Sequence, residues 1–145
     1  MIYSIPVNKL FDKLNENWGG DRGKKWLDVN HIQKSEYRNG QLNGNSCKKL
    51  LEKLSNLKTQ VPKRLWKYIV ALDKFNEVRK SCFGQVLNPN YKQKIEDFKK
   101  AYEKLNIPMT NKVHVLVVHV PEYCDKKKQA LGVDSEQALY VYKIV

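Results

Sequence analysis

Apolar residues recur along most of this chain at intervals of three and four positions, which is the repeat of an amphipathic helix. The first apolar stripe consists of Val7, Phe11, Leu14 and Trp18. Gly19 and Gly20 follow it, and since glycine commonly ends a helix, the pattern predicts a short helix up to Trp18. Ser4 is a suitable N-cap for this helix, and Pro6 is tolerated near its first turn.

Residues 19–44 interrupt the helical repeat, because five of the seven glycines lie there: Gly19, Gly20, Gly23, Gly40 and Gly44. We predict a long connection here, with one helical turn around residues 27–37. Unstructured loops of this length are uncommon inside compact domains. We therefore divide the chain into residues 1–44, an N-terminal helix with a glycine-rich connection, and residues 45–145, a helical body.

The helical body carries three further apolar stripes. The first stripe lies on a helix that Asn45 or Ser46 can cap and that ends before Pro62. It consists of Cys47, Leu50, Leu54, Leu57 and Val61. The second ends at the following glycine and consists of Leu65, Ile69, Leu72, Phe75, Val78 and Cys82. The third is expected to have Asn88 as its cap and Pro89 as its first residue, and consists of Tyr91, Ile95, Phe98, Tyr102 and Leu105.

Residues 112–123 are open to two interpretations. Their β-branched valines favour a strand. A lone strand would have no partner in this chain, however, whereas a helix could pack on the preceding helices, so we predict a helix that Pro121 distorts or breaks. A last helix is expected over residues 136–142. The fold class predicted is mainly α, an irregular helical bundle of about five to six helices, with a short strand at residues 112–123 as the alternative.

The net charge is the main compositional feature of the chain. Lysine and arginine total 27 against 15 acidic residues, which gives a formal charge of +12 and a pI of about 9.6. Such a surplus attracts polyanions, so we expect nucleic acid as a partner. The residues expected to contact it form local clusters: Lys24, Lys25, Lys48, Lys49, Lys63, Arg64, Lys67, Lys126, Lys127 and Lys128. Trp66 and Tyr68 adjoin the cluster of Lys63, Arg64 and Lys67, and they either stack on bases or pack in the core.

Membrane and secreted classes do not fit the sequence. No run reaches the roughly 18 apolar residues of a membrane span, and the first residues lack the pattern of a signal peptide. Three widely spaced cysteines do not form a disulfide framework. We expect an intracellular protein without membrane contact, and a nuclear location would agree with nucleic-acid binding.

Catalytic and metal-binding patterns are weak. His114, His119 and Cys124 are spaced by five residues, whereas ligands on one helical face are spaced by three or four, so we expect no zinc site. Cys124 with His119 or His31 could form a nucleophile pair only in a tertiary geometry that the sequence does not show. The carboxylates and lysines of the third helix alternate as on a solvated surface: Glu96, Asp97, Glu103, Lys94, Lys99, Lys100 and Lys104. We assign no catalytic residue, metal or cofactor.

Several short motifs occur in a characteristic order between residues 42 and 139. The first runs from Leu42-Asn43-Gly44-Asn45-Ser46-Cys47 into a leucine-rich helix. Later motifs are Lys112-Val113-His114, His119-Val120-Pro121-Glu122-Tyr123-Cys124, Leu131-Gly132 and Ser135-Glu136-Gln137-Ala138. In this order the motifs resemble transposase-like proteins that transposable elements encode in invertebrate genomes.

The resemblance implies the C-terminal helical part of a ribonuclease-H-like transposase, in a truncated or diverged form. It also implies a helix at Lys112-Val113-His114. Tyr140 stands where such proteins carry a further glutamate, and the upstream acidic motifs are absent. Because a two-metal nuclease needs several carboxylates, Glu136 alone cannot build its site.

We therefore expect a non-catalytic, basic helical domain that contacts nucleic acid through lysine clusters. The alternatives are a protein–protein interaction or self-association module, or a remnant with no specific activity. A metal-dependent nuclease is the least expected of the functions.

Overall fold

The computed structural model describes residues 4–34, 41–82, 87–109, 111–114, 117–118 and 120–127. Its α-helices are α1 (Ser4–Trp18), α2 (Arg22–Val29), α3 (Gly44–Glu52), α4 (Leu54–Gln60), α5 (Trp66–Cys82), α6 (Tyr91–Glu103), α7 (Asn111–His114) and α8 (Val120–Lys127). A 3-10 turn, η1 (Lys63–Leu65), leads into α5. Within the described ranges there is no strand, only an isolated bridge between Lys34 and Leu42. The predicted mainly α fold class is confirmed.

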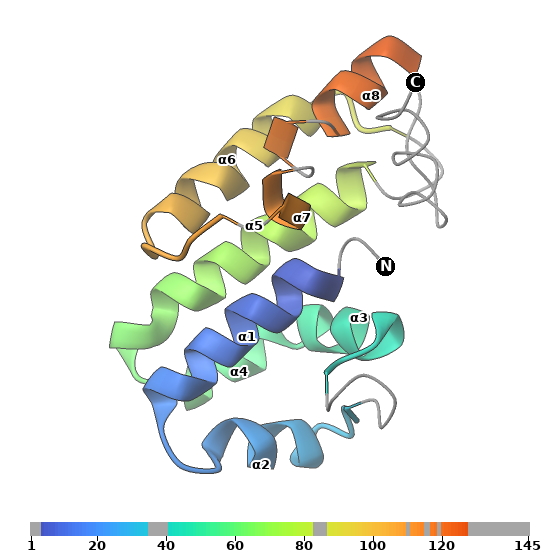
Figure 1. Cartoon of the computed structure of the whole chain (residues 1–145). Coiled ribbons are helices and arrows are strands. Elements are labelled where there is room, and N and C mark those ends of the chain that lie inside the picture. The colour runs from blue at the N-terminus through green and yellow to red at the C-terminus, as the bar shows by residue number, and fades with distance from the viewer. Residues whose placement is uncertain are drawn as a thin grey trace.

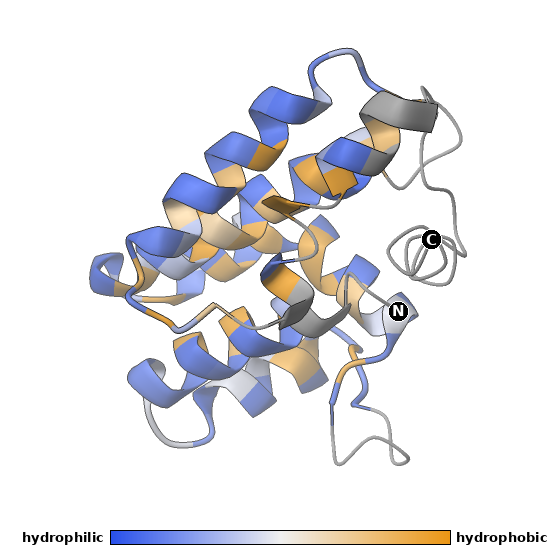
Figure 2. Cartoon of the chain, turned by 45° about the horizontal axis from the view of Figure 1, so that its top comes forward, coloured by the Kyte–Doolittle hydropathy of each residue, from blue (hydrophilic) through white to orange (hydrophobic). Residues whose placement is uncertain are grey.

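The helix α5 is the centre of the bundle. It packs most extensively against α6 on one side and against α1 on the other, as Figure 1 shows. Among the shorter helices, α2 packs against α1, α4 packs against α5, and α3 contacts both α1 and α5. Apolar residues face the spaces between the helices and polar residues face outward, as the colouring of Figure 2 shows.

Every position of the four predicted apolar stripes is buried. The largest fully buried side chains are Tyr102, Phe75, Phe98, Leu10, Leu14, Ile32, Leu50, Leu57, Leu65 and Leu72. They belong to one continuous core, to which both the predicted N-terminal part (1–44) and the predicted helical body (45–145) contribute. Helical spacing alone therefore locates most of the core.

The helix α2 corrects the prediction of a single turn around residues 27–37. It begins earlier, at Arg22, and its buried side chains Trp26 and Leu27 anchor it to the core. Gly23 is not a linker residue, because its backbone N–H donates to Asn15 Oδ1 at 3.1 Å and a Cβ there would collide with that side chain. This glycine allows α2 to approach α1 closely.

The start of the helical body differs from the prediction in its cap. Asn43 caps α3, since its Oδ1 accepts a hydrogen bond from the Ser46 N–H at 2.9 Å. Neither Asn45 nor Ser46 is the cap, and the buried Ser46 hydroxyl instead donates to the Gln33 carbonyl at 2.6 Å. The predicted single helix is also interrupted at Lys53, which separates α3 from α4.

The helix α6 begins later than predicted. Asn88 and Pro89 precede the helix, Asn90 occupies the N-cap position and Tyr91 is the first helical residue. The Asn88 side chain accepts a hydrogen bond from the Asn90 N–H at 2.8 Å. Asn88 therefore stabilises the turn before the helix rather than the helix end itself.

The described part of residues 112–123 is helical, as predicted. The helix α7 covers Asn111–His114, and α8 begins at Val120. Pro121 is the second residue of α8, where proline is tolerated. Residues 117–118 are π-helical, so the helical path is distorted close to this proline, in line with the prediction. The helix predicted over residues 136–142 lies outside the described residues. In the described parts of the chain, no helix has the length and apolar character needed to cross a membrane.

Candidate nucleic-acid interface

The outer face of the α5–α6 pair forms a shallow groove with a volume of about 390 Å³. Lys67 and Lys74 line it from α5, Lys100 lines it from α6, and Lys104 lines it from the C-cap position directly after α6. Lys67 and Lys74 are two helical turns apart, while Lys100 and Lys104 are one turn apart. Each pair therefore projects from one face of its own helix. We call this feature the α5–α6 groove.

The floor of the α5–α6 groove is apolar. Val70, which is 44% exposed, and Ala101 lie between the lysines in its lining. Asp97 is the acidic lining residue, and its Oδ1 accepts a hydrogen bond from Gln93 Nε2 at 2.8 Å. Four ammonium groups against one carboxylate leave a strongly positive surface suited to a chain of phosphates.

Buried aromatic rings hold the two helices of the groove together. The Phe98 ring lies 5.4 Å from the Phe75 ring and 5.8 Å from the Tyr102 ring, measured between centroids. These rings join the inner face of α6 to α5, opposite the solvent-facing lysines. The spacing of the groove lysines thus depends on the core behind them.

Trp66 lies at the start of α5 and is partly buried against the core. The ammonium groups of Lys58 and Lys63 lie 4.7 and 5.8 Å from the centroid of its indole, and its Nε1–H donates to the Lys58 carbonyl at 3.2 Å. A base could stack on this ring only by displacing a lysine, which costs about 0.5–1 kcal/mol for an exposed cation–π contact. Trp66 therefore packs partly against the core, and its stacking on a base stays a prediction.

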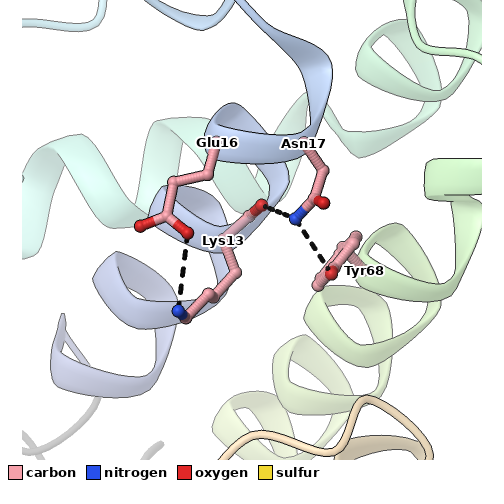
Figure 3. A network of polar contacts seen from close by, with 4 residues as sticks. All are labelled: Lys13, Glu16, Asn17 and Tyr68. Atoms are coloured by element: carbon pink, nitrogen blue, oxygen red, sulfur yellow. Dashed lines mark hydrogen bonds and ion pairs between the residues drawn. The ribbon is translucent and has the colours of Figure 1, made fainter.

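Arg64 has a structural contact. Its Nη1–H donates to the Asn17 carbonyl at 2.8 Å, which ties η1 to the end of α1. Asn17 Nδ2 in turn donates to the Lys13 carbonyl at 2.7 Å and to the Tyr68 hydroxyl at 3.2 Å, as drawn in Figure 3. An ion pair of 3.4 Å between Lys13 and Glu16 adjoins this network (Figure 3). Its bonds from Asn17 to Tyr68 and from Arg64 to Asn17 add polar contacts where the end of α1 meets the beginning of α5.

The predicted basic residues do not all come together. Lys67 lines the α5–α6 groove, and Lys63 and Arg64 immediately precede its helix. Lys48 and Lys49 lie on α3, at the other end of the molecule from the start of α5 (Figure 1), and Lys24 and Lys25 lie on α2. The structure gives no side-chain placement for Lys126 and Lys127 of α8, and Lys128 is outside the described residues.

Three lysines of the groove were not predicted as site residues: Lys74, Lys100 and Lys104. The sequence pattern assigned Lys100 and Lys104 to a solvated helix surface and did not single out Lys74. Their repeat on the polar sides of two consecutive helices is the signal that could have identified them.

The histidines and cysteines do not assemble into a recognisable site. His114 is exposed on α7, Cys124 is buried in α8, and His119 is outside the described residues. In the portion of the chain that the structure describes, no three His, Cys, Asp or Glu residues are grouped so that they could hold a metal ion.

All three cysteines are buried. Burial raises the pKa of Cys47 to about 12. A side-chain hydrogen bond with Cys124, together with burial, raises the pKa of Cys82 far above its ordinary value. Because the thiolate is the reactive form, Cys47 and Cys82 should be inert in the folded protein. The hydrogen bond with Cys82 lowers the pKa of Cys124, so Cys124 is protected from reagents by its complete burial rather than by its pKa.

We expect the native protein to react slowly with an aromatic disulfide reagent at mildly alkaline pH, and all three thiols to react rapidly in concentrated guanidinium chloride. Absorbance of the released thiolate measures both rates. Rapid release of one equivalent from the native protein would show that one cysteine is accessible and ionised. A Cys47→Ser variant should leave the slow native rate unchanged.

Comparison of the chain with protein-family models, with curated proteins and with solved structures finds no significant match.

Proposed function

We propose that this chain binds nucleic acid through the α5–α6 groove and is not itself an enzyme. The observation that carries the proposal is the gathering of Lys67, Lys74, Lys100 and Lys104 around an apolar floor. Phosphate contacts by lysine are independent of sequence and supply most of non-specific affinity for nucleic acid. The formal charge of +12 adds a long-range attraction that steers a polyanion towards this surface.

We also propose that the chain is related to transposase-like proteins. The order of motifs between residues 42 and 139 supports this relation, and so does the helix at Asn111–His114, which the resemblance implies. The non-catalytic part of the proposal rests on Tyr140, which stands where such proteins carry a further glutamate.

Replacing Lys100 and Lys104 by glutamine should weaken nucleic-acid binding and its salt dependence. Each lost phosphate contact lowers the slope of log K against log salt by about 0.7 for a single strand and about 0.9 for a duplex. The double variant should therefore lower the slope by about 1.4 or about 1.8. Fluorescence anisotropy of labelled oligonucleotides at several salt concentrations measures this slope.

The matched control is the double variant Lys48→Gln/Lys49→Gln on α3. It lowers the formal charge by the same two units, but these exposed lysines lie outside the α5–α6 groove. Its slope should equal that of the unaltered protein. Equal losses in both variants would mean that net charge, not the groove, drives binding, and no binding at low salt would reject the function. If polyglutamate bound as tightly as the oligonucleotides, and if the Lys100→Gln/Lys104→Gln variant weakened that binding too, the groove would be assigned to an acidic protein partner instead.

A further inference from the structure

A second pocket, with a volume of about 340 Å³, opens between α2 and α4. The end of α1 also reaches it, so that the indoles of Trp18 and Trp26 line it together. Both indoles are held in the core, with only 8% and 5% of their surface exposed. Val29 adds an apolar side chain that is 75% exposed. The α2–α4 pocket therefore has a rigid aromatic floor and an accessible apolar edge.

Two carboxamides in the lining of this pocket are held in defined orientations. Asn30 Nδ2 donates to the Trp26 carbonyl at 2.9 Å, which leaves its Oδ1 as an acceptor for a ligand. Trp26 Nε1–H donates to Asn56 Oδ1 at 2.9 Å, which leaves the Asn56 amide nitrogen as a donor. Gln60, one helical turn after Asn56, places a third carboxamide in the lining. Adjacent donors and acceptors of this kind match the hydrogen-bonding edge of a nucleobase.

The charged residues of the lining are Arg22 and Lys25, both exposed on α2, and the lining contains no carboxylate. Together with Val29 they follow a spacing of three and four residues, so one face of α2 carries both cations and the apolar edge. Cations beside a base-sized apolar pocket suit the phosphate that flanks a base.

The pocket and the α5–α6 groove lie towards the same end of the bundle. The end of α1 and the beginning of α5 meet there, where Arg64 bonds to the Asn17 carbonyl next to Trp18 (Figure 1). Lys58 and Lys63, which flank Trp66, add positive charge between the two features. A flexible polyanion could contact both, whereas a duplex keeps its bases paired and stacked and cannot place one in a pocket without unpairing it.

We infer that the α2–α4 pocket binds an unpaired base of single-stranded nucleic acid, with Arg22 and Lys25 on a neighbouring phosphate. This inference rests on the proposed function and makes single strands the preferred ligand. The base packs against the indole floor and Val29, and the carboxamides of Asn30 and Asn56 contact its edge. The strand continues over Trp66 and the flanking Lys58 and Lys63 into the α5–α6 groove.

The test compares the pocket variant Lys25→Gln/Gln60→Ala with the matched control Lys53→Gln/Ser55→Ala. Lys53, directly before α4, and Ser55 of α4 are exposed, but they do not line the pocket or the α5–α6 groove. Anisotropy titrations use single-stranded DNA, single-stranded RNA and a DNA duplex of equal length. The pocket variant should bind single strands about tenfold more weakly and the duplex less than twofold more weakly. The control should change neither, and circular dichroism verifies that both variants are folded.

Loss of affinity with either kind of single strand supports the inference, and the more strongly affected strand identifies the sugar that the site accepts. Equal effects of the pocket variant on single strands and duplex, or no effect on either, would overturn it. In that case the Lys100→Gln/Lys104→Gln variant would still bind more weakly, so the groove would remain the binding site. If the unaltered protein bound neither form at low salt, the proposed function would fall, and the base pocket with it.

Discussion

Replacing Phe98 by alanine should lower the free energy of unfolding by about 4 kcal/mol, because a large aromatic side chain is removed from a packed core. Phe98 is fully buried, and its ring contacts Phe75 of α5 and Tyr102 of α6. A loss of this size should lower the melting temperature by on the order of 10 °C. Urea unfolding followed by circular dichroism measures the free energy, and a thermal melt measures the temperature.

The variant Phe98→Leu is the control for side-chain volume. It keeps an apolar group at the same position, so its cost should be closer to about 1.5 kcal/mol. If Phe98→Ala cost less than about 1 kcal/mol, the α5–α6 pair could not be the packed centre described above, and the geometry of the α5–α6 groove would be in doubt with it. Weaker nucleic-acid binding by folded Phe98→Ala would show that the groove depends on this core.

The core could be predicted from the sequence because it depends on local periodicity. A residue such as Leu72 or Phe98 is buried on the apolar side of its helix whatever that helix packs against. The same reasoning failed at Gly23, where a glycine that appeared to belong to a linker allows α2 to approach Asn15 of α1. The cap of α3 was also misplaced, because the Ser46 hydroxyl bonds to Gln33, a residue outside its helix. Tertiary contacts decided both cases.

The candidate site was less predictable than the core. Basic residues that adjoin in sequence, such as Lys48 and Lys49, need not act together, and Arg64 instead bonds to the end of α1. The α5–α6 groove joins lysines about 30 residues apart, such as Lys67 and Lys100, because two helices pack through the aromatic rings on their inner faces. Spacing within one helix does not reveal which helix will lie beside it. The sequence therefore predicted Lys67, which belongs to a local basic cluster, but not the other three lysines of the groove.

The buried carboxamide of Asn8 joins α1 to the segment before α3. Its Nδ2 donates to the Leu42 carbonyl at 3.0 Å, and its Oδ1 accepts from the Leu42 N–H at 2.8 Å. One side chain thus satisfies both backbone groups of a residue 34 positions away. Asn8 is 7% exposed and Leu42 is 2% exposed, so water cannot easily replace these bonds.

Replacing Asn8 by leucine should therefore destabilise the protein by about 2–6 kcal/mol, because each of the two buried backbone groups left without a partner costs about 1–3 kcal/mol. Urea unfolding measures this loss, and faster hydrogen exchange at the Leu42 amide would locate it. The Asn8→Asp variant is the control, since a protonated carboxyl can both donate and accept whereas a carboxylate can only accept. Its stability should rise as the pH falls through the titration of the introduced carboxyl, and the leucine variant should show no such rise. A leucine variant as stable as the parent would mean that the Leu42 backbone finds other partners, and that Asn8 does not hold the N-terminal helix to the remainder of the core.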